Sequence, residues 1–493
     1  MNQSSPSPSP ANAVPSGSAD APAPPIAARA PELGRRRGQR LFNFGLGAIV
    51  LALAWYTFTA DVADHLHLYL GLLIIILSVS PGLRWARQAN FSLPLFEAFM
   101  LTSINTYAIP LLSGHQALKN FSTETLTLAA LGVIAFQGIA LFTYISVRAR
   151  AQRTPFWREA IVNENISYKL GYGIAITTAY TFADNFTSLI PGQLAGPLRA
   201  FAYGIGIVAT FLQCRLWGAG ILPKSEKNFF LVLTTTQIIL SWSSLFLVGG
   251  VSIIVLGLLG YVTGGKKIPV LFLVVSLPCI AVLHNGKSAM REKYWEQQAP
   301  MPTLGAVPAF FQEWIRYGLD PEIQAQRNDS NRLLERTSLF HIMCLVVANT
   351  PAQLPFLNGT TYAQIPGQFV PRFFWPEKPV GHISTYTLAI YYGLQVEEDT
   401  TKTTIGFGLL TEAYANFGFF GLAILGVFIG AGSKYVSVSA ASSPLLSYGG
   451  IFMVILMAWS FQTEMTMSIW LSSLFQGCVA VLGLLYVTRH YLK

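Results

Sequence analysis

Long apolar runs separated by short polar segments dominate the pattern of hydrophobic positions along this chain. An α-helix needs about 20 predominantly apolar residues to cross a bilayer. Runs near this length lie at about residues 41–60, 67–83, 93–113, 125–147, 170–190, 197–217, 228–248, 250–265, 268–284, 409–432, 447–464 and 468–488. The pattern therefore predicts an all-α polytopic membrane protein with about 12 transmembrane helices. The boundary between the seventh and eighth helices is set near Gly249 and Gly250, where almost no polar residue separates the runs.

Lys and Arg residues gather in alternate short loops between these runs. They are Arg84, Arg87, Arg148, Arg150, Arg153, Arg158, Lys224, Lys227, Lys266, Lys267, Lys434, Arg489 and Lys493. Cytoplasmic loops of membrane proteins are enriched in Lys and Arg, so this side and both termini are predicted to be cytoplasmic. The net charge of +9 therefore reflects topology and does not indicate a nucleic-acid partner.

The first 40 residues differ in composition from the rest of the chain. Met1 to about Gly34 is rich in Pro, Ala and Ser, and it has too few large apolar residues to offset its ordering entropy. A basic cluster follows and is expected to hold the N-terminus in the cytoplasm. The cluster comprises Arg35, Arg36, Arg37 and Arg40. The predicted organisation is a disordered tail over 1–40, helices 1–9 over 41–284, one large loop over 285–404 and helices 10–12 over 405–493.

The loop over 285–404 lies between helices 9 and 10, on the side opposite the basic loops. It greatly exceeds the about 12–15 residues beyond which a loop is usually functional or disordered, and its aromatic and apolar residues favour function. Asn331 to Ala348 is predicted to be helical, with Asp329 or Ser330 as cap and Pro351 beyond its end. Its apolar half, Leu339 to Ala348, is too short to span a bilayer. It is expected to dip into the interface or to pack on other helices.

Charged residues in this loop lie beside aromatic ones. Arg332 and Arg336 are four residues apart and share a helical face, whereas His341 falls roughly on the opposite face. Further on, Asn358 to Pro379 reads NGTTYAQIPGQFVPRFFWPEKP. Its four prolines exclude a continuous helix or a central strand, and its large rings suit a membrane interface. This stretch is predicted to be a rigid loop at the bilayer surface that presents Arg372 and Lys378 to an anionic, lipid-linked ligand, or else a loop that its aromatics merely anchor.

The cysteines and histidines give no pattern typical of a metal site. Cys214, Cys279, Cys344 and Cys478 form no CxxC and no Cys/His pair, and the seven histidines are scattered. No metal or organic cofactor is expected.

Four motifs in the C-terminal half carry a family resemblance. They are HNGKSAMREKY at 284–294, RLLER at 332–336, FVPRFFWPEKP at 369–379 and GFGLLTEAYANFGFFG at 406–421. Together they resemble bacterial O-antigen and exopolysaccharide repeat-unit polymerases, a class that includes the enterobacterial common antigen polymerase. A large late periplasmic loop followed by a Gly-flanked acidic motif and the final spans is similar to the order in that family.

This resemblance implies a multi-pass enzyme of the bacterial inner membrane. It would polymerise oligosaccharide repeat units at the periplasmic face, by glycosyl transfer from a polyprenyl-diphosphate donor. Its partners would be the polyprenyl-diphosphate-linked oligosaccharide and membrane lipids, with a chain-length regulator protein as a further candidate. Guanidinium and ammonium groups suit a diphosphate leaving group. The candidates are Lys287, Arg291, Arg332, Arg336, Arg372 and Lys378. The alternative is that some of these are solvated charges paired with Glu292, Glu335 or Glu377.

Glu412 is the leading candidate for the base that activates the acceptor hydroxyl. It lies at the predicted mouth of a span, and Asn416, four residues on, shares its face and is assigned to substrate binding. Glu412 could instead be a structural partner of one of the arginines. Glu464, His284 and His341 are weaker candidates for the base.

Three other functions remain open from the sequence. An O-antigen ligase would use the same donor and a similar arginine set. A lipid-linked mannosyltransferase favours an acidic pair in the first extracytoplasmic loop, where Asp61 and Asp64 lie, although such a loop is also ordinary surface. A polysaccharide transporter or flippase should carry charges near the bilayer midplane. The acidic residues inside predicted spans, Glu97 and Asp184, lie off centre, which favours surface chemistry.

Overall fold

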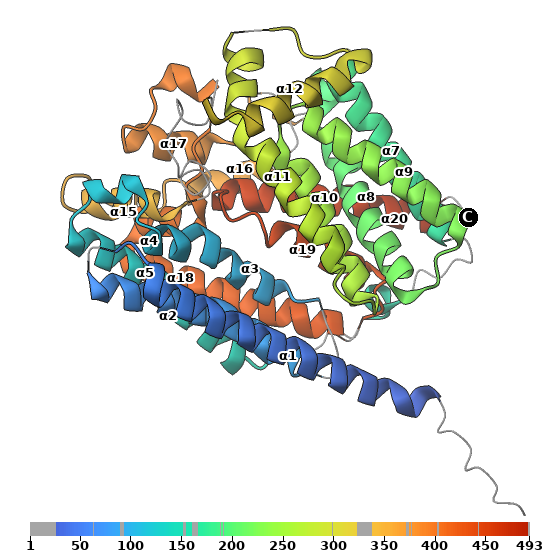
Figure 1. Cartoon of the computed structure of the whole chain (residues 1–493), viewed down its shortest axis with the longest axis horizontal. Coiled ribbons are helices and arrows are strands. Elements are labelled where there is room, and N and C mark those ends of the chain that lie inside the picture. Colours follow the sequence, from blue (N-terminus) through green and yellow to red (C-terminus); the bar gives the residue numbers. More distant parts are fainter. Residues whose placement is uncertain are drawn as a thin grey trace, which may run out of the picture.

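The computed structural model describes residues 26–62, 64–88, 93–150, 154–159, 166–187, 189–190, 192–297, 299–322, 338–370, 374–375, 377–401, 404–441 and 443–491. Within these ranges every regular element is a helix (Figure 1). Eight helical stretches have the length and apolar composition of a membrane span: Gly38–Thr59, His65–Ala86, Leu95–Leu112, Thr123–Ser146, Leu198–Ala219, Val270–Trp295, Gly408–Ser439 and Met467–Tyr486. The chain therefore has the architecture of a helical membrane protein.

The N-terminal helices and one late helix form the first of two helical groups (Figure 1). Its members are α1 (Ile26–Thr59), α2 (His65–Ala86), α3 (Leu95–Ser103), η1 (Ile104–Ala108), α4 (Ile109–Leu112), α5 (Thr123–Ser146) and α18 (Gly408–Ala441). α2 packs between α1 and α5, and α3 continues through the π-helical turn η1 into α4. α18 follows α5 along its length, although the two are far apart in sequence.

The second group consists of the helices from the middle of the chain. Its members are α7 (Ile166–Phe186), α8 (Gly192–Ala219), α9 (Lys224–Ser243), α10 (Leu247–Thr263), α11 (Val270–Arg291), η3 (Glu292–Glu296), η4 (Leu304–Ala306) and α12 (Val307–Leu319). α8 packs against α7 and α10, and α12 folds back onto the end of α11. α19 (Tyr448–Trp459) and α20 (Met467–Tyr491) connect the two groups, because both pack on α8 while α19 also contacts α3 and α18.

Small residues allow the close approach of α5 and α18. Gly426 and Gly430 lie one turn apart on α18, in the small-xxx-small spacing typical of packed membrane helices. A Cβ atom at Gly430 would lie 2.4 Å from the carbonyl oxygen of Ala140 on α5, and one at Gly426 would lie 3.1 Å from that of Phe136. A larger side chain at either position would therefore push the two helices apart.

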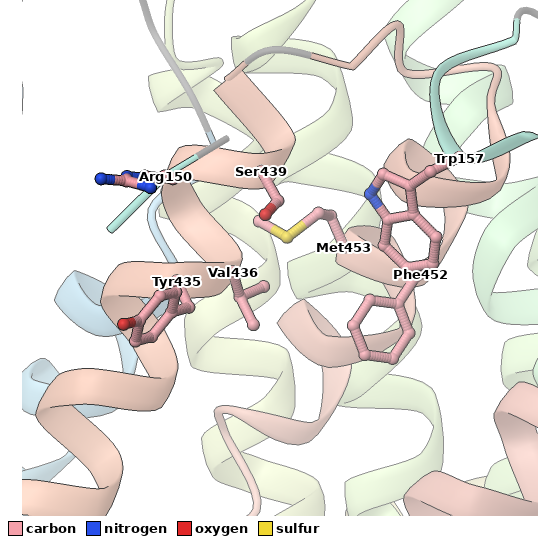
Figure 2. Close-up of a pocket in the computed structure, with 7 residues that line it drawn as sticks. All are labelled: Arg150, Trp157, Tyr435, Val436, Ser439, Phe452 and Met453. Atoms are coloured by element: carbon pink, nitrogen blue, oxygen red, sulfur yellow. The ribbon is translucent and has the colours of Figure 1, made fainter. Parts of the chain in front are cut away.

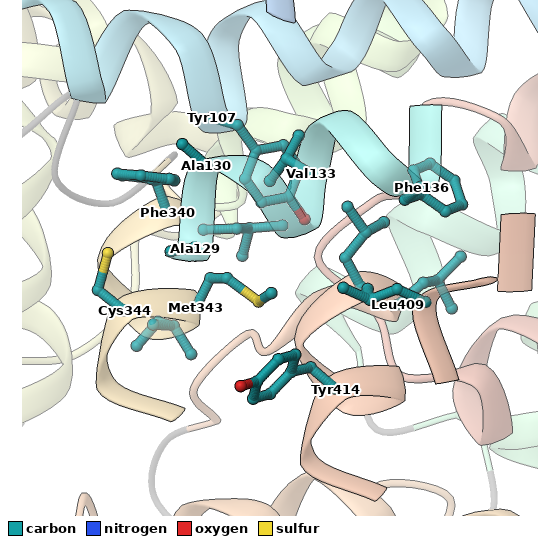
Figure 3. Close-up of a cluster of buried hydrophobic side chains, with 14 of the residues drawn as sticks. Tyr107, Ala129, Ala130, Val133, Phe136, Phe340, Met343, Cys344, Leu409 and Tyr414 are labelled. Atoms are coloured by element: carbon teal, nitrogen blue, oxygen red, sulfur yellow. The ribbon is translucent and has the colours of Figure 1, made fainter. Parts of the chain in front are cut away.

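The short apolar helix α15 (Phe340–Asn349) is embedded in the first group (Figure 3). Phe340, Met343 and Cys344 are completely buried against α5 and α18. Its packing on other helices confirms one of the two predicted placements, and Pro351 lies beyond its end as expected. The proposed N-terminal half of this helix, with its cap and both arginines, lies outside the described residues.

Helices occupy all of the predicted spans, but twelve crossings remain a prediction. α10 and α19 have 17 and 12 residues and are shorter than a typical span. α7 and α9 are long enough but are less apolar than the eight candidates. α1 also begins at Ile26, well before the predicted start of the first span near residue 41.

Two predicted boundaries are corrected by the structure. The turn between α9 and α10 lies at Ser244–Phe246 and not at Gly249–Gly250. Its central residue, Leu245, has a positive φ of 60° and a fully buried side chain, so it carries no polar turn signal. α11 continues to Arg291 beyond the predicted end at 284 because Gly286, which resembles a helix breaker, gives close contact with Trp314 on α12.

The described parts of 285–404 are folded. Besides η3, η4, α12 and α15 they contain η5 (Tyr362–Gln364), α16 (Ile365–Phe369), α17 (Ile383–Tyr391) and η6 (Glu397–Thr401). In the stretch from Asn358 to Pro379, two short helices replace a continuous one, as the prolines require. Phe374 and Trp375 are exposed, which suits residues that anchor a loop at a membrane interface.

Candidate functional site

The acidic motif of 406–421 forms the first turns of α18. α18 begins at Gly408, whose φ of 75° is favourable only for glycine. Its N–H donates to the carbonyl of Glu464 (3.0 Å), which brings the turn between α19 and α20 against the start of α18. Gly418 has a φ of 61° and bends the helix, and a Cβ there would lie 3.0 Å from the ring of Phe356. The glycines that flank Glu412 thus fix the backbone on both sides of it.

Glu412 is completely buried at the junction of α18 and α20. Its Oε2 accepts a hydrogen bond of 2.6 Å from the N–H of Met467, the first residue of α20. A carboxylate is favourable at a helix N-terminus because the orphan N–H groups and the helix dipole stabilise negative charge. The other oxygen, Oε1, has no hydrogen-bond partner among the described residues, although the Thr361 side chain lies beside the carboxyl group. No cation of the described chain pairs with it.

Asn416 shares the face of Glu412, as its spacing predicts, but its amide is already engaged. Nδ2 donates to the carbonyl of Glu412 (2.8 Å) and to the hydroxyl of Thr361 (2.9 Å). Oδ1 accepts from the N–H of Gly359 (3.0 Å). Asn416 therefore ties the segment 357–361 to α18, and it positions Thr361 next to Glu412.

Buried hydroxyl groups continue this polar junction. The Ser384 hydroxyl donates to the carbonyl of Thr361 (3.1 Å) and to Oε1 of Gln364 (2.8 Å). The hydroxyl groups of Thr385 and Thr466 lie 3.3 Å apart and link α17 to the residue before α20. The junction thus joins α17, α18, α20 and the segment 357–369 around one buried carboxyl group.

The structure places the predicted basic residues in different surroundings. Lys287 lies on α11 and interacts electrostatically with Glu464, whose backbone contacts the start of α18. Arg291, one turn further on, donates from Nη2 to the carbonyl of Leu245 (3.0 Å) and lies 4.1 Å from the ring centroid of Trp295. Lys378 donates to the carbonyls of its own loop, at Gln368 (2.6 Å) and Val370 (2.9 Å).

Lys287 is therefore linked to the Glu412 junction through Glu464, and Lys378 contacts the segment 357–369 of the junction at Gln368. Arg291 holds the turn between α9 and α10, and Lys378 closes its own loop. Arg332, Arg336 and Arg372 lie outside the described residues.

The weaker base candidates have distinct environments. Desolvation raises the pKa of Glu464, and the Lys287 charge lowers it part of the way. His341 stacks on His115 with ring centroids 5.5 Å apart. Burial and then the neighbouring His115 lower the pKa of His341 to about 4, which makes it a weak base near neutral pH. In the first loop, Asp64 accepts from the N–H of Leu66 (3.1 Å) and caps α2.

Sequence reasoning missed two parts of the junction. Thr361 gives no signal because it lies in a polar loop among similar residues. The N–H of Met467 is a backbone group and has no side-chain signature. Across the described ranges no three His, Cys, Asp or Glu side chains gather as they would around a metal ion.

Comparison with protein-family models gives a match over part of the chain. Residues 219–463 match a domain of unknown function (DUF8712). The matched segment runs from the end of α8 to the turn after α19, and so includes Lys287, Glu412 and Asn416 but not Met467. No curated protein and no solved structure matches the chain.

Proposed function

We propose that this chain is a glycosyltransferase that polymerises lipid-linked oligosaccharide repeat units, using a polyprenyl-diphosphate donor. The observation that carries the proposal is the buried carboxyl group of Glu412. One oxygen is fixed by a backbone N–H, while the other has no hydrogen-bond partner among the described residues. A base needs this combination, because one bond orients it and a free oxygen accepts the proton.

In the proposed reaction, Oε1 of Glu412 takes the proton of the acceptor hydroxyl. The acceptor oxygen forms a bond to the anomeric carbon of the donor glycan. The bond between that carbon and the diphosphate oxygen breaks, and its electron pair leaves with the polyprenyl diphosphate. Because Glu412 is closed off from solvent, the segment 357–369 or its neighbours must move to admit the acceptor. Thr361, on this segment, would move with it.

Cationic groups would stabilise the charge on the departing diphosphate. Lys287 is one described candidate, since its partner Glu464 lies against the start of α18. Arg332, Arg336 and Arg372 are proposed to complete the set. The reaction would take place at the periplasmic face of a bacterial inner membrane, with 285–404 on that side and both termini in the cytoplasm. The product would serve O-antigen or exopolysaccharide synthesis.

The test is polymerisation by the purified full-length chain. The protein in nanodiscs is given one synthetic polyprenyl-diphosphate repeat unit, and products are separated by size. The proposal predicts a ladder of lipid-linked oligomers together with release of polyprenyl diphosphate. Absence of both, from protein that melts cooperatively and that binds the donor, would contradict it. Transfer to lipid A core in place of a repeat unit would identify a ligase.

A transporter is a second candidate because charged groups lie inside the helical bundle. Glu97 on α3 is buried, accepts a hydrogen bond of 3.4 Å from Tyr144, and interacts electrostatically with Lys434. Ionisable groups inside a span often mark a transport path. Movement of labelled lipid-linked glycan across protein-containing vesicles, without oligomer formation, would favour this function.

A further inference from the structure

A cavity lies at the end of the bundle opposite the Glu412 junction along α18. It has a volume of about 310 Å³ and lies between the last turns of α18, the first turns of α19 and the segments after α5 (Figure 2). Its lining residues are Arg150, Trp157, Tyr435, Val436, Ser439, Phe452 and Met453. No acidic residue is among them.

Two side chains of this cavity carry donors that have no acceptor in the described part of the chain. Among the described residues, Arg150 takes part in no ion pair or hydrogen bond, and its guanidinium is exposed and points away from the other lining side chains (Figure 2). The indole N–H of Trp157 is buried without an acceptor. The ring lies so close to Gly449 that a Cβ there would be 2.4 Å from Nε1. Buried donors of this kind are normally satisfied, so an unpaired one calls for an acceptor that the chain does not supply.

The neighbouring Lys434 interacts with groups outside this cavity. Lys434 precedes Tyr435 on α18, but its Nζ lies 5.2 Å from the ring centroid of Tyr144 and interacts with Glu97. The positive charge of the cavity therefore comes from Arg150. Its other walls are largely apolar or aromatic, through Val436, Phe452 and Met453.

The cavity lies at the level where the apolar stretches of two helices end, which is the level of a bilayer surface. The apolar stretch of α18 ends at Ser439, one of the lining residues, and that of α5 ends at Ser146, shortly before Arg150. Trp and Tyr side chains concentrate at this depth of a membrane, and basic pockets between helix ends bind anionic head groups. An acceptor with a negative charge and an apolar stem would satisfy Arg150, Trp157 and the apolar wall together.

We propose that this cavity binds the phosphate-bearing head group of an anionic membrane phospholipid. Arg150 donates to the phosphate oxygens at the outer side of the cavity, and the Trp157 indole donates to an oxygen of the glycerol. The side chains of Phe452 and Met453 contact the first methylene groups. The site is independent of the glycosyltransferase proposal, because it involves none of the residues around Glu412.

The experiment is titration of the purified full-length protein in detergent, followed by native mass spectrometry. The probes are dioctanoyl phosphatidylglycerol, dioctanoyl phosphatidylcholine, farnesyl phosphate and inorganic phosphate. Phosphatidylglycerol is expected to bind saturably, at least about tenfold more tightly than phosphatidylcholine, because only the former carries a net charge for Arg150. Arg150→Gln should weaken phosphatidylglycerol binding about tenfold, the usual effect of losing a charged hydrogen bond.

Arg148→Gln is the matched control, since Arg148 is exposed two residues away and does not line the cavity. Arg148→Gln should leave the affinity for phosphatidylglycerol within about twofold of wild type. Trp157→Phe keeps an aromatic ring but loses the N–H, and it should weaken binding by about threefold. Equal losses in Arg148→Gln and Arg150→Gln, or equal affinity for the two phospholipids, would overturn the proposal. Displacement of phosphatidylglycerol by equimolar inorganic phosphate would assign the site to a free anion, and displacement by farnesyl phosphate alone to an isoprenoid phosphate. Both outcomes contradict a phospholipid site.

Discussion

Two buried carboxyl groups, Glu97 and Glu412, lie in the same helical group but in different surroundings. Glu97 faces the phenol of Tyr144 and the charge of Lys434. Glu412 meets a backbone N–H at the start of α20, and one of its oxygens has no partner among the described residues. A buried carboxylate with a counter-charge is balanced within the protein, whereas one with a spare oxygen remains able to bind a proton or a substrate. Both groups are buried, so it is the remaining hydrogen-bond capacity of Glu412, and not its burial, that supports the proposal of a base.

The largest effect is expected from two of the cations that are proposed to stabilise the departing diphosphate. Arg336→Ala and Arg372→Ala should each abolish polymer while the protein stays inserted and abundant, because the diphosphate would lose its charge stabilisation. Lysine at either position should rescue poorly, since it lacks the bidentate fork. Polymer length in cells, with Arg148→Ala as the control, measures this. Normal polymer from both alanine variants would remove these residues from the site.

The next effect concerns the residue that holds Thr361 beside Glu412. Asn416→Ala removes three hydrogen bonds in a buried site and should lower the free energy of unfolding by about 2 kcal/mol. Thr360→Ala changes an exposed neighbour in the same segment and should have little effect. Thermal unfolding of the two variants in the same detergent tests the difference. Equal melting temperatures would show that Asn416 does not hold the segment.

A smaller effect tests whether Glu97 is balanced by Lys434. Lys434→Met should lower the melting temperature by leaving Glu97 without its counter-charge. Adding Glu97→Gln to that variant should recover part of the lost melting temperature. The expected coupling free energy is about 1 kcal/mol, typical of neighbours in one network. Additive effects of the two substitutions would contradict the pairing and would make Glu97 available for a transport function.

The smallest effect is a pH dependence at the turn before α20. Because desolvation raises the pKa of Glu464 above its usual value of 4.5, the folded protein keeps this proton to higher pH than the unfolded chain does. The contribution of Glu464 to the free energy of unfolding is therefore fully present below pH 4.5, and it falls as pH rises through the raised pKa. Glu464→Gln should reduce the fall in melting temperature as pH rises above 4.5, and Lys287→Met should make that fall steeper. A wild-type slope in Glu464→Gln would refute this assignment.

The helical fold was largely predictable because each long apolar run corresponds to a helix in the structure. The sequence could not show that α9 turns at Leu245, since an apolar residue with a positive φ looks like part of a helix. It also could not show that α11 passes through Gly286, where a residue that usually ends helices provides close packing. In both places tertiary contacts decide the backbone, and local propensity does not.

The candidate site was only partly predictable. The spacing of four residues correctly put Glu412 and Asn416 on one face. It did not reveal that Asn416 binds the protein itself, or that Lys378, expected to face a ligand, donates to two carbonyls of its own loop. The N–H that orients Glu412 comes from a residue 55 positions away. Backbone partners over such distances leave no pattern in the side chains.

The most direct test of the account is a comparison of Glu412→Gln with Glu97→Gln in the purified protein. Turnover of a synthetic polyprenyl-diphosphate repeat unit, affinity for that donor and melting temperature are measured on the same samples. If Glu412 is the base, Glu412→Gln should slow turnover by about two to four orders of magnitude with nearly unchanged binding and melting, and Glu97→Gln should turn over at close to the wild-type rate. Near-normal turnover by Glu412→Gln, or joint loss of stability and donor binding in that variant, would contradict the account and leave Glu412 a structural cap of α20.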